Sequence, residues 1–218
     1  MLLPLSRQQL NELLPLIPTR EQYEYYWGTG QDLFRRIMVS VAIATIAWVL
    51  HFRVVNTPWE LVVFIVGAVG AFYWLLGPVP LAMGRNAQLR KYPYSALWWA
   101  VIDDCYLSEE VSTKQEKVDE RGRLDVSYAT ESFINLELGD DDTDIVLTYR
   151  SPMQRIYKRI EPGEEICLII FAADRHFTRL SRCTSDAYIP SLRLWVSDYP
   201  YLRRDSFKQL VRQIRLRK

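Results

Sequence analysis

Residues 37–83 decide the fold. They consist of two apolar runs, a polar loop and a short extension: IMVSVAIATIAWVLHF (37–52), RVVNTPWE (53–60), LVVFIVGAVGAFYWLL (61–76) and GPVPLAM (77–83). Each apolar run has about 16 residues, slightly fewer than the about 20 that cross a bilayer as a straight helix. Apolar residues that flank each run supply the missing length, and Arg35 and Arg36 can extend to the headgroups. The stretch therefore predicts a transmembrane helical hairpin over residues 33–83.

The alternative interpretation is a buried helical hairpin in a soluble domain. Helices in such domains usually keep a polar face, whereas Ser40 and Thr45 are the only polar side chains between Ile37 and Leu50. No solvent-facing stripe can be drawn on either run, and this favours the membrane. Small residues four apart, such as Gly67 and Ala71, would let two helices approach closely.

The loop between the runs predicts where the second helix starts and how the hairpin is oriented. Thr57-Pro58-Trp59-Glu60 fits a capping box, with Thr57 as the N-cap residue and Glu60 bonding back to it. Several Lys and Arg residues flank the two runs, but the loop between them holds only Arg53. Because cytoplasmic flanks are enriched in positive residues, we expect two spans with both termini on the cytoplasmic side, or on the stromal side in a plastid.

The 218 residues divide into three predicted regions. These are an amphipathic and interfacial N-terminal segment (1–32), the transmembrane hairpin (33–83) and a cytoplasmic or stromal β-rich domain that ends in a basic helix (84–218). In the first region, Ser6 to Ile17 predicts a short amphipathic helix. Tyr25, Tyr26 and Trp27 predict either an aromatic belt at the headgroups or a partner-binding patch.

Alternating hydrophobicity predicts strands in the third region. The large apolar residues of 124–138 fall on even positions, with Phe133 as the exception, as in a half-buried antiparallel strand. Residues 145–149 would pair with this strand across an acidic turn. Further strands are predicted at 96–111, 166–171, 177–183 and 191–196, although residues 96–102 could equally be helical. A loop is predicted at 112–121 and a helix from Asp205 to the end. The fold class is thus a membrane α-helical hairpin plus a mainly antiparallel β domain with a C-terminal helix, in which a small barrel and a pleckstrin-homology-like sheet fit equally.

The net charge of +1 conceals a strong asymmetry. Residues 103–144 hold 14 acidic and 4 basic residues, and residues 145–218 hold 15 basic and 7 acidic ones. The C-terminal helix carries much of the positive charge, and its candidate contact residues are Arg204, Lys208, Arg212 and Arg215. Each such cation contributes roughly 1 kcal/mol near an anionic surface. The alternative is that the apolar face of the helix closes the domain core and the basic face is merely solvated.

The residues with reactive side chains form no recognisable catalytic or metal pattern. Asp174, Arg175 and His176 are adjacent, but the only other histidine is His51, and phosphate-loop, dinucleotide and Gly-x-Ser-x-Gly motifs are absent from the sequence. The aspartates at 140–144 lack EF-hand spacing and suit a turn. Cys167 lies in an apolar run, which predicts a buried, reduced thiol. We therefore expect a protein that is not an enzyme, with no cofactor, no metal, no nucleic-acid partner and no small-molecule substrate.

Two motifs carry a family resemblance. Asp186-Ala-Tyr-Ile-Pro190 followed by Leu194-Trp-Val-Ser-Asp-Tyr-Pro-Tyr-Leu-Arg-Arg204, together with Tyr25-Tyr26-Trp27-Gly28, resembles an uncharacterised family of two-helix membrane proteins of cyanobacteria and, by extension, plastids. Some members are labelled phosphate transporter permeases. A permease needs polar or broken helices that line a pathway, which the two apolar runs do not supply. The resemblance implies a photosynthetic membrane.

These observations predict a membrane-anchored binding or scaffold protein in a thylakoid or plasma membrane. Its specific form would be an assembly or accessory factor of a large photosynthetic membrane complex, which it would contact through Tyr25, Tyr26, Trp27 and the basic face of its last helix. Two alternatives remain open: a module that binds anionic lipid headgroups, and an auxiliary subunit of a transporter.

Overall fold

The computed structural model describes residues 1–118, 124–140, 143–177 and 180–216, and it describes side chains except at 112–129, 141–144, 178–184 and 217–218. The chain forms two compact units. The sheet unit combines Met1–Leu13 with Tyr92–Lys218, and the helical unit is Leu14–Lys91. The first 13 residues therefore fold with the C-terminal part of the chain.

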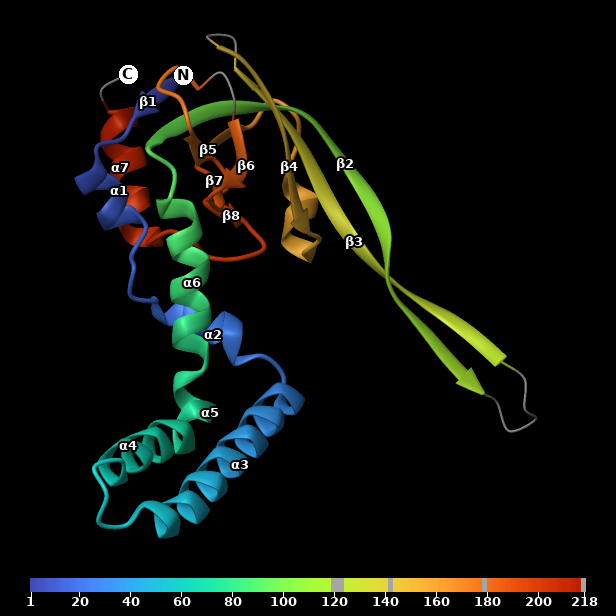
Figure 1. Ribbon diagram of the computed structural model, residues 1–218. Helices are drawn as coiled ribbons and strands as arrows, with labels where there is room; N and C mark the ends of the chain where they lie inside the picture. The colour runs from blue at the N-terminus through green and yellow to red at the C-terminus, as the bar shows by residue number, and fades with distance from the viewer. Residues whose placement is uncertain (119–123, 141–142, 178–179, 217–218) are drawn as a thin grey trace. The chain divides into compact units, whose positions relative to one another are not determined.

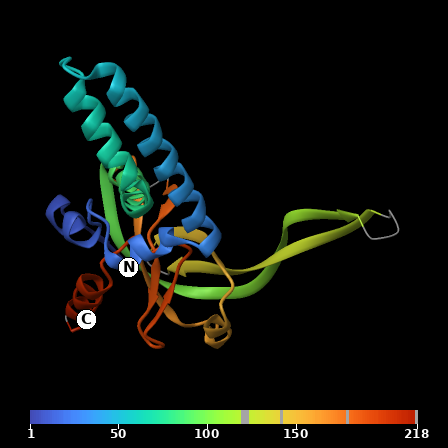
Figure 2. The same cartoon turned by 90° about the horizontal axis from the view of Figure 1, so that it is seen from below.

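The helical unit is dominated by two long segments that run antiparallel (Figures 1 and 2). Its helices, in chain order, are α2 (Arg20–Trp27), α3 (Gly30–Val54), α4 (Glu60–Ala71), α5 (Tyr73–Leu76) and α6 (Pro78–Arg90). Helices α3 and α4 pack closely because glycines of α4 face α3. A Cβ atom at Gly67 would lie 2.7 Å from the Cβ of Ala47, and one at Gly70 would overlap Ile43. Small residues thus pack the two helices together, as the sequence suggested.

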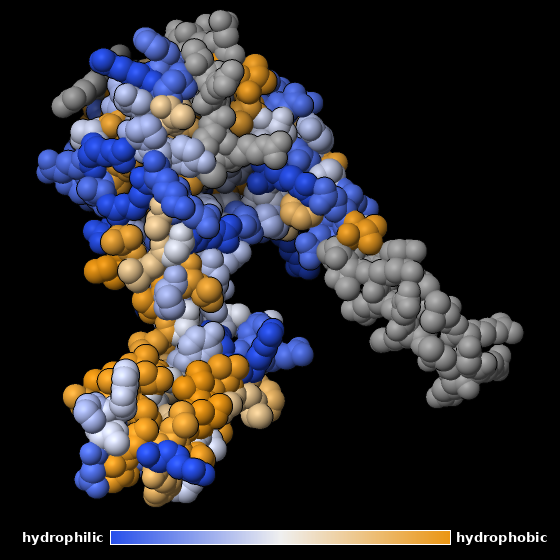
Figure 3. Space-filling view, viewed as in Figure 1, coloured by the Kyte–Doolittle hydropathy of each residue, from blue (hydrophilic) through white to orange (hydrophobic). Residues whose placement is uncertain are grey.

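Helix α3 has the length and composition of a membrane span. It is a single helix of 25 residues, and its most apolar window is 11% buried. Large apolar side chains cover its outside, where Trp48 is 65% exposed, whereas Ser40 is 3% exposed. Apolar residues gather over the α3 and α4 part of the molecule in Figure 3. One helix is therefore long and apolar enough to cross a membrane, or up to two if the bent segment after it is counted as one span.

The second apolar run is not a straight helix. It breaks at Phe72, where Glu60–Ala71 and Tyr73–Arg90 meet at a bend of 55°. The backbone N–H of Trp74 donates to the hydroxyl of Ser40 on α3, at 2.9 Å, instead of continuing the helical ladder. A side chain that takes over a ladder position is a common cause of a kink. Pro78, which lacks an N–H, then starts α6.

The predicted capping box at the start of the second helix is wrong. Helix α4 begins at Glu60 rather than Pro58, and its N-cap residue, Trp59, makes no side-chain cap. The Glu60 carboxylate accepts the backbone N–H of Asn56 at 2.9 Å, and the Thr57 hydroxyl donates to the carbonyl of Val54 at 2.6 Å. Both polar groups therefore close the loop itself and leave the helix uncapped by a side chain.

The sheet unit contains an antiparallel sheet with a helix at each end of its sequence (Figure 1). Its elements are β1 (Leu2–Pro4), α1 (Arg7–Leu13), β2 (Tyr94–Val118), β3 (Leu124–Asp140), β4 (Thr143–Pro152), the 3₁₀ helix η1 (Arg155–Arg159), β5 (Glu165–Ala172), β6 (Leu180–Thr184), β7 (Ala187–Ile189), β8 (Leu194–Val196) and α7 (Arg204–Arg215). The strand order is β4-β3-β2-β5-β7-β8, with β1 added beside β2 and β6 beside β5. The β-rich domain and its C-terminal helix are confirmed.

The sheet is open. Between its outermost strands β4 and β8, the described residues show no backbone pairing, although the Tyr149 hydroxyl of β4 donates to the Val196 carbonyl of β8 at 2.9 Å. A closed barrel would require these strands to pair, so that prediction does not describe this sheet. One apolar cluster lies on one face of the sheet, where Trp98, Leu136 and Leu168 are fully buried. Residues that point to the other face of the central strands, such as Leu97 and Ile169, are fully buried as well.

Several predicted strands are confirmed. The apolar side chains of β3 at Ile134, Leu136 and Leu138 point into the core, as the even-numbered alternation predicted. The first half of that alternating stretch lies outside the residues whose side chains are described. Strand β4 pairs with β3, and Cys167 on β5 is fully buried with a free thiol. Strand β7, which the sequence did not predict, pairs with β8 through a tight turn.

The loop predicted at 112–121 is wrong over its first part. Strand β2 continues to Val118, and its register with β3 runs to the pair Val118 and Leu124, past a shift near Val111. Where β2 no longer pairs with β5 and β3 no longer pairs with β4, the two strands continue as a two-stranded ribbon (Figure 2). The ribbon is held by backbone pairing between neighbours in the chain, which requires no apolar periodicity. The last part of β2 is charged and has no hydrophobic alternation, so the sequence did not indicate a strand there.

The first predicted helix is shorter than expected. Helix α1 ends at Leu13 rather than Ile17. Pro15 explains the difference, because proline disfavours a helical conformation at the residue before it and has no N–H to donate. Its predicted apolar side is otherwise confirmed, since Leu10 and Leu13 are buried.

Candidate functional site

Helix α7 forms one wall of the candidate site. Phe207 and Val211 point into the sheet unit and are 0% and 3% exposed. The backbone N–H of Arg203, at the start of α7, donates to the carbonyl of Leu13 at 2.8 Å and so joins α7 to the end of α1. Arg212 and Arg215 lie in the last turn, where the helix dipole favours positive charge. The predicted amphipathic helix is confirmed, and three of its cations, Lys208, Arg212 and Arg215, are exposed on its outer face.

Two aromatic rings of the sheet pack against Phe207 of α7 and against each other. Tyr188 on β7 and Trp195 on β8 lie with their ring centroids 4.8 Å apart, and the Trp195 ring is 5.4 Å from that of Phe207. Tyr188 also meets Phe207 edge to face at 6.4 Å. Such contacts fix the rotamers of large side chains. The helix is therefore held at a defined position above the β7–β8 turn.

A groove opens between α7 and that turn, with a volume of about 470 Å³, and we call it the basic groove. Its lining residues are Tyr188, Pro190, Arg193, Lys208, Val211, Arg212 and Arg215. Among the residues that the structure describes, the lining thus contains four cationic side chains, one from the turn and three from the helix, and no acidic one. The four cations are all exposed at the surface. An arrangement of this kind attracts anions.

Arg193 enters the groove from an unusual backbone conformation. Its φ is +52°, in the left-handed region, and its N–H points to the Pro190 carbonyl at 3.4 Å. Glycine and asparagine adopt this region more easily than arginine does. The turn therefore holds a cation at a position where its backbone would favour a smaller residue.

The structure places three of the four predicted basic residues together. Lys208, Arg212 and Arg215 line the basic groove, whereas the guanidinium of Arg204 lies over the Trp195 ring, 5.4 Å from its centroid. Sequence reasoning missed Arg193, Pro190 and Tyr188. Pro190 was a signal for a turn, but a turn alone does not tell which helix faces it.

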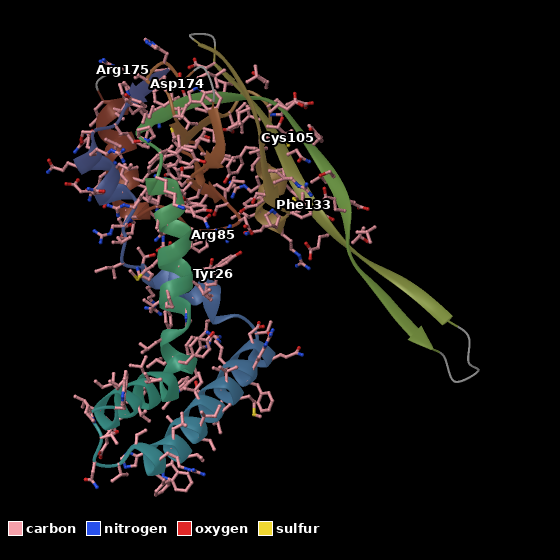
Figure 4. The ribbon with its side chains drawn as sticks, in the orientation of Figure 1. Tyr26, Arg85, Cys105, Phe133, Asp174 and Arg175 are labelled. Carbon is pink, nitrogen blue, oxygen red and sulfur yellow. The ribbon has the colours of Figure 1, made fainter. Side chains whose placement is uncertain are left out.

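The predicted aromatic residues lie in the helical unit, on α2, which Thr19 and Gln22 cap at its start. The Tyr25 ring meets that of Tyr26 edge to face at 5.2 Å. It also has the guanidinium of Arg85, on α6, at 5.7 Å. Figure 4 labels Tyr26, on α2, and Arg85, on α6.

Trp27 packs within the same unit. Its ring is 6.5 Å from that of Trp74, and the Arg36 guanidinium lies 5.2 Å from its centroid and donates to its backbone carbonyl. The three predicted rings are therefore neighbours on one helix, and Tyr25 and Trp27 also contact other helices of the unit. Tyr25 is the most open of them, at 41% exposure.

Reactive side chains do not converge on a second site in the part of the chain that the structure describes. There, no three His, Cys, Asp or Glu residues are placed to hold a metal ion. Asp174 and Arg175 lie in the turn between β5 and β6 (Figure 4). Cys105 is half-buried, and burial raises the pKa of its thiol, which keeps it protonated and poorly nucleophilic.

Comparisons with known proteins identify the family but no activity. A sequence model of a family of unknown function (DUF8619) matches residues 3–217, so the chain belongs to that family. Neither a curated protein nor a solved structure is significantly similar to the chain.

Proposed function

We propose that this member of a family without an assigned function is a non-enzymatic, membrane-anchored binding protein. In this proposal, α3 and the bent segment from α4 to α6 insert into the bilayer as two spans. The sheet unit remains in the aqueous phase and binds a protein partner. Its specific form is an assembly or accessory factor of a large photosynthetic membrane complex, which is supported by the resemblance to a cyanobacterial membrane family.

The observation that carries the proposal is the distribution of apolar side chains on α3 and α4. Trp48 and Phe64 are 65% and 67% exposed, on helices whose contact face is already filled by small residues. Each large apolar side chain that stays in water forgoes roughly 1.5–3 kcal/mol of burial free energy. Many such side chains in one patch mark a surface that belongs in contact with lipid or protein.

The binding role is assigned to two sets of residues. One set is the aromatic cluster of Tyr25, Tyr26 and Trp27 on α2, next to the proposed spans in sequence. The other is the basic face of α7, with Arg204, Lys208, Arg212 and Arg215. Aromatic rings and arginines are enriched at protein interfaces, which supports this assignment.

A topology experiment tests the anchor. We expect the α3–α4 loop on the far side of the membrane and the sheet unit, with both termini, on the cytoplasmic or stromal side. In a variant without native cysteines, a new cysteine at exposed Thr57 should react with a membrane-impermeant maleimide in intact cells or vesicles of known orientation. One at exposed Glu161 should react only after permeabilisation. Equal labelling of the two positions in sealed membranes would contradict the two-span topology.

Affinity purification in mild detergent tests the binding role. Tagged protein should recover a stoichiometric membrane complex, identified by mass spectrometry of the native-gel band. Replacing Arg204, Lys208, Arg212 and Arg215 with glutamate should release the complex while the protein stays in the membrane fraction. If the wild-type protein repeatedly purifies alone, or if the glutamate variant retains the complex, the assignment of these contacts is wrong.

The exposed basic face of α7 also favours a second candidate function, a module that binds anionic lipid headgroups. This candidate predicts that the purified protein carries anionic lipid and no protein partner. It also predicts vesicle binding that weakens steeply with salt.

A further inference from the structure

We infer that the basic groove binds an acidic polypeptide segment that carries an apolar residue between its carboxylates. This inference rests on the proposed binding function and names the chemistry that the partner must present. The residues of the groove differ from the contacts that the sequence predicted. The groove includes Arg193, Tyr188 and Pro190, and it excludes Arg204, whose guanidinium lies over the Trp195 ring.

The geometry of the cations points to an elongated anion. Lys208, Arg212 and Arg215 follow one face of α7 at spacings of four and three residues. Seven residues of an α-helix rise roughly 10 Å, which exceeds the width of a single carboxylate or phosphate group. An occupant with several negative charges along its length could meet all three side chains at once, and a peptide with acidic residues has this form.

The two walls of the groove distinguish a chain from a flat surface. Three cations lie on α7 and the fourth, Arg193, comes from the β7–β8 turn on the other side. A bilayer surface is met by cations that share one plane, whereas a polypeptide lying in a groove is met from both sides. With a volume of about 470 Å³, the groove is large enough to hold the side chains of several residues. These features favour a peptide over lipid headgroups.

The lining of the groove adds an apolar requirement. Tyr188 and Val211 are buried at 7% and 3% exposure, and Pro190 lies beside them in the turn. Aromatic packing of Tyr188 against Trp195 and Phe207 makes this part of the lining rigid. An apolar side chain of the partner would bury surface there, while its acidic neighbours meet the cations. The expected motif therefore places an apolar residue between acidic ones.

The charge distribution of the groove supports the sign of the occupant. The four charged residues among the described lining residues are all basic, so no carboxylate among them neutralises the groove. Arg193 also holds its cation from a left-handed conformation that an arginine rarely adopts. A turn that served only to connect β7 with β8 would favour glycine or asparagine at that position.

A fluorescent peptide, EELEE, tests the inference with the full-length protein in nanodiscs of zwitterionic phosphatidylcholine. Fluorescence anisotropy should show saturable binding that weakens as salt increases, and the neutral analogue QQLQQ should not bind. The variant EENEE should bind more weakly than EELEE. The substitutions K208Q/R212Q/R215Q should lower the affinity for EELEE at least about ten-fold, since each exposed charge pair contributes a few-fold.

The chain offers a matched control for this variant. Arg155, Lys158 and Arg159 are exposed cations on η1, outside the groove, and R155Q/K158Q/R159Q removes the same charge and the same residue types. It should change the affinity by less than about two-fold. R193N removes the fourth cation while keeping a residue that tolerates the left-handed backbone, so its effect, about three-fold, reports charge rather than strain.

The outcomes separate this inference from the proposed function. Equal weakening by the groove and η1 variants would mean that net charge alone attracts the peptide, and the inference would fall. It would also fall if EELEE did not bind while vesicles of phosphatidylglycerol bound through the same groove residues. If a membrane complex still co-purified with K208Q/R212Q/R215Q, the binding function would stand and the groove would be the wrong site. If no complex co-purified with the wild type, the binding function itself would fail.

Discussion

The two units of this protein place their apolar residues in opposite ways. In the sheet unit, Trp98 and Leu168 are fully buried, and α7 turns its cations outward. In the helical unit, Trp48 and Phe64 are mostly exposed while the hydroxyl of Ser40 is buried between helices, where it accepts the Trp74 N–H. The sheet unit thus buries its apolar side chains within itself, whereas the helical hairpin turns many of them outward. Outward apolar side chains are what the proposed membrane anchor would require, because lipid would then cover them.

The largest expected effect comes from placing charge on the outside of α3. Ile46 and Val49 are 59% and 53% exposed. If α3 were a surface helix in water, I46D/V49D would be nearly neutral. If α3 spans a bilayer, each aspartate opposes insertion by about 2.5–3.5 kcal/mol near the centre. We expect the double variant to leave the carbonate-resistant membrane fraction or to be degraded, as measured by fractionation and immunoblotting.

The sheet unit provides the control for this change. Val146 on β4 is 75% exposed and belongs to the sheet unit. V146D should leave the abundance and the membrane fraction of the protein unchanged. If I46D/V49D behaved like V146D, the opposition between the two units would be wrong, and α3 would be a surface helix.

The next effect in size tests the contact between α3 and α4. A Cβ atom at Gly70 would overlap the side chain of Ile43 and lie 3.0 Å from its Cβ, whereas one at Gly84 on α6 would meet nothing within 4 Å. G70A should therefore destabilise the hairpin by about 1–3 kcal/mol through overpacking. The same substitution at Gly84 should stabilise its helix by about 0.5–1 kcal/mol. Thermal unfolding in detergent, followed by circular dichroism at 222 nm, measures both changes.

If alanine lowers the stability at Gly70 but raises it at Gly84, small residues are structurally required at the α3–α4 contact. A neutral G70A would show instead that the two helices separate easily. Membrane insertion of both variants should match that of the wild type, because alanine is as apolar as the site requires.

Periodic features of the sequence predicted the elements that depend on burial. The alternation at Ile134, Leu136 and Leu138 in β3 and the apolar face of α7 at Phe207 and Val211 could both be recognised without a structure. Each of these elements faces a single environment along its length. The period of its apolar residues therefore follows directly from its secondary structure. The apolar run of α3, which has no such period, was recognised from its length and composition.

Other features depended on partners that are distant in sequence. The second apolar run reads as continuous, yet it breaks because Trp74 finds Ser40, 34 residues earlier. The basic groove needs Arg193 to face α7, and strand pairing rather than local sequence brings that turn there. The ribbon residues up to Val118 pair through their backbones, which leaves no hydrophobic period to read. Tertiary hydrogen bonds and packing, not local preference, determined these three features.

The smallest expected effect concerns the sheet unit alone. The buried Tyr149 hydroxyl donates to the Val196 carbonyl at 2.9 Å, and burial, reinforced by the nearby Asp186, raises the pKa of this tyrosine well above 10. In the unfolded chain Tyr149 ionises near pH 10, so the stability that its neutral form contributes is complete below that pH and is lost as the pH rises further. Y149F should lower the unfolding free energy at pH 8 by about 1 kcal/mol, through the lost hydrogen bond. It should also show a smaller loss of stability than the wild type between pH 8 and 10.5. Denaturant unfolding at both values, with G84A as a control that leaves the sheet unchanged, measures the difference; identical pH dependence in Y149F and wild type would show that other groups govern alkaline unfolding of the sheet.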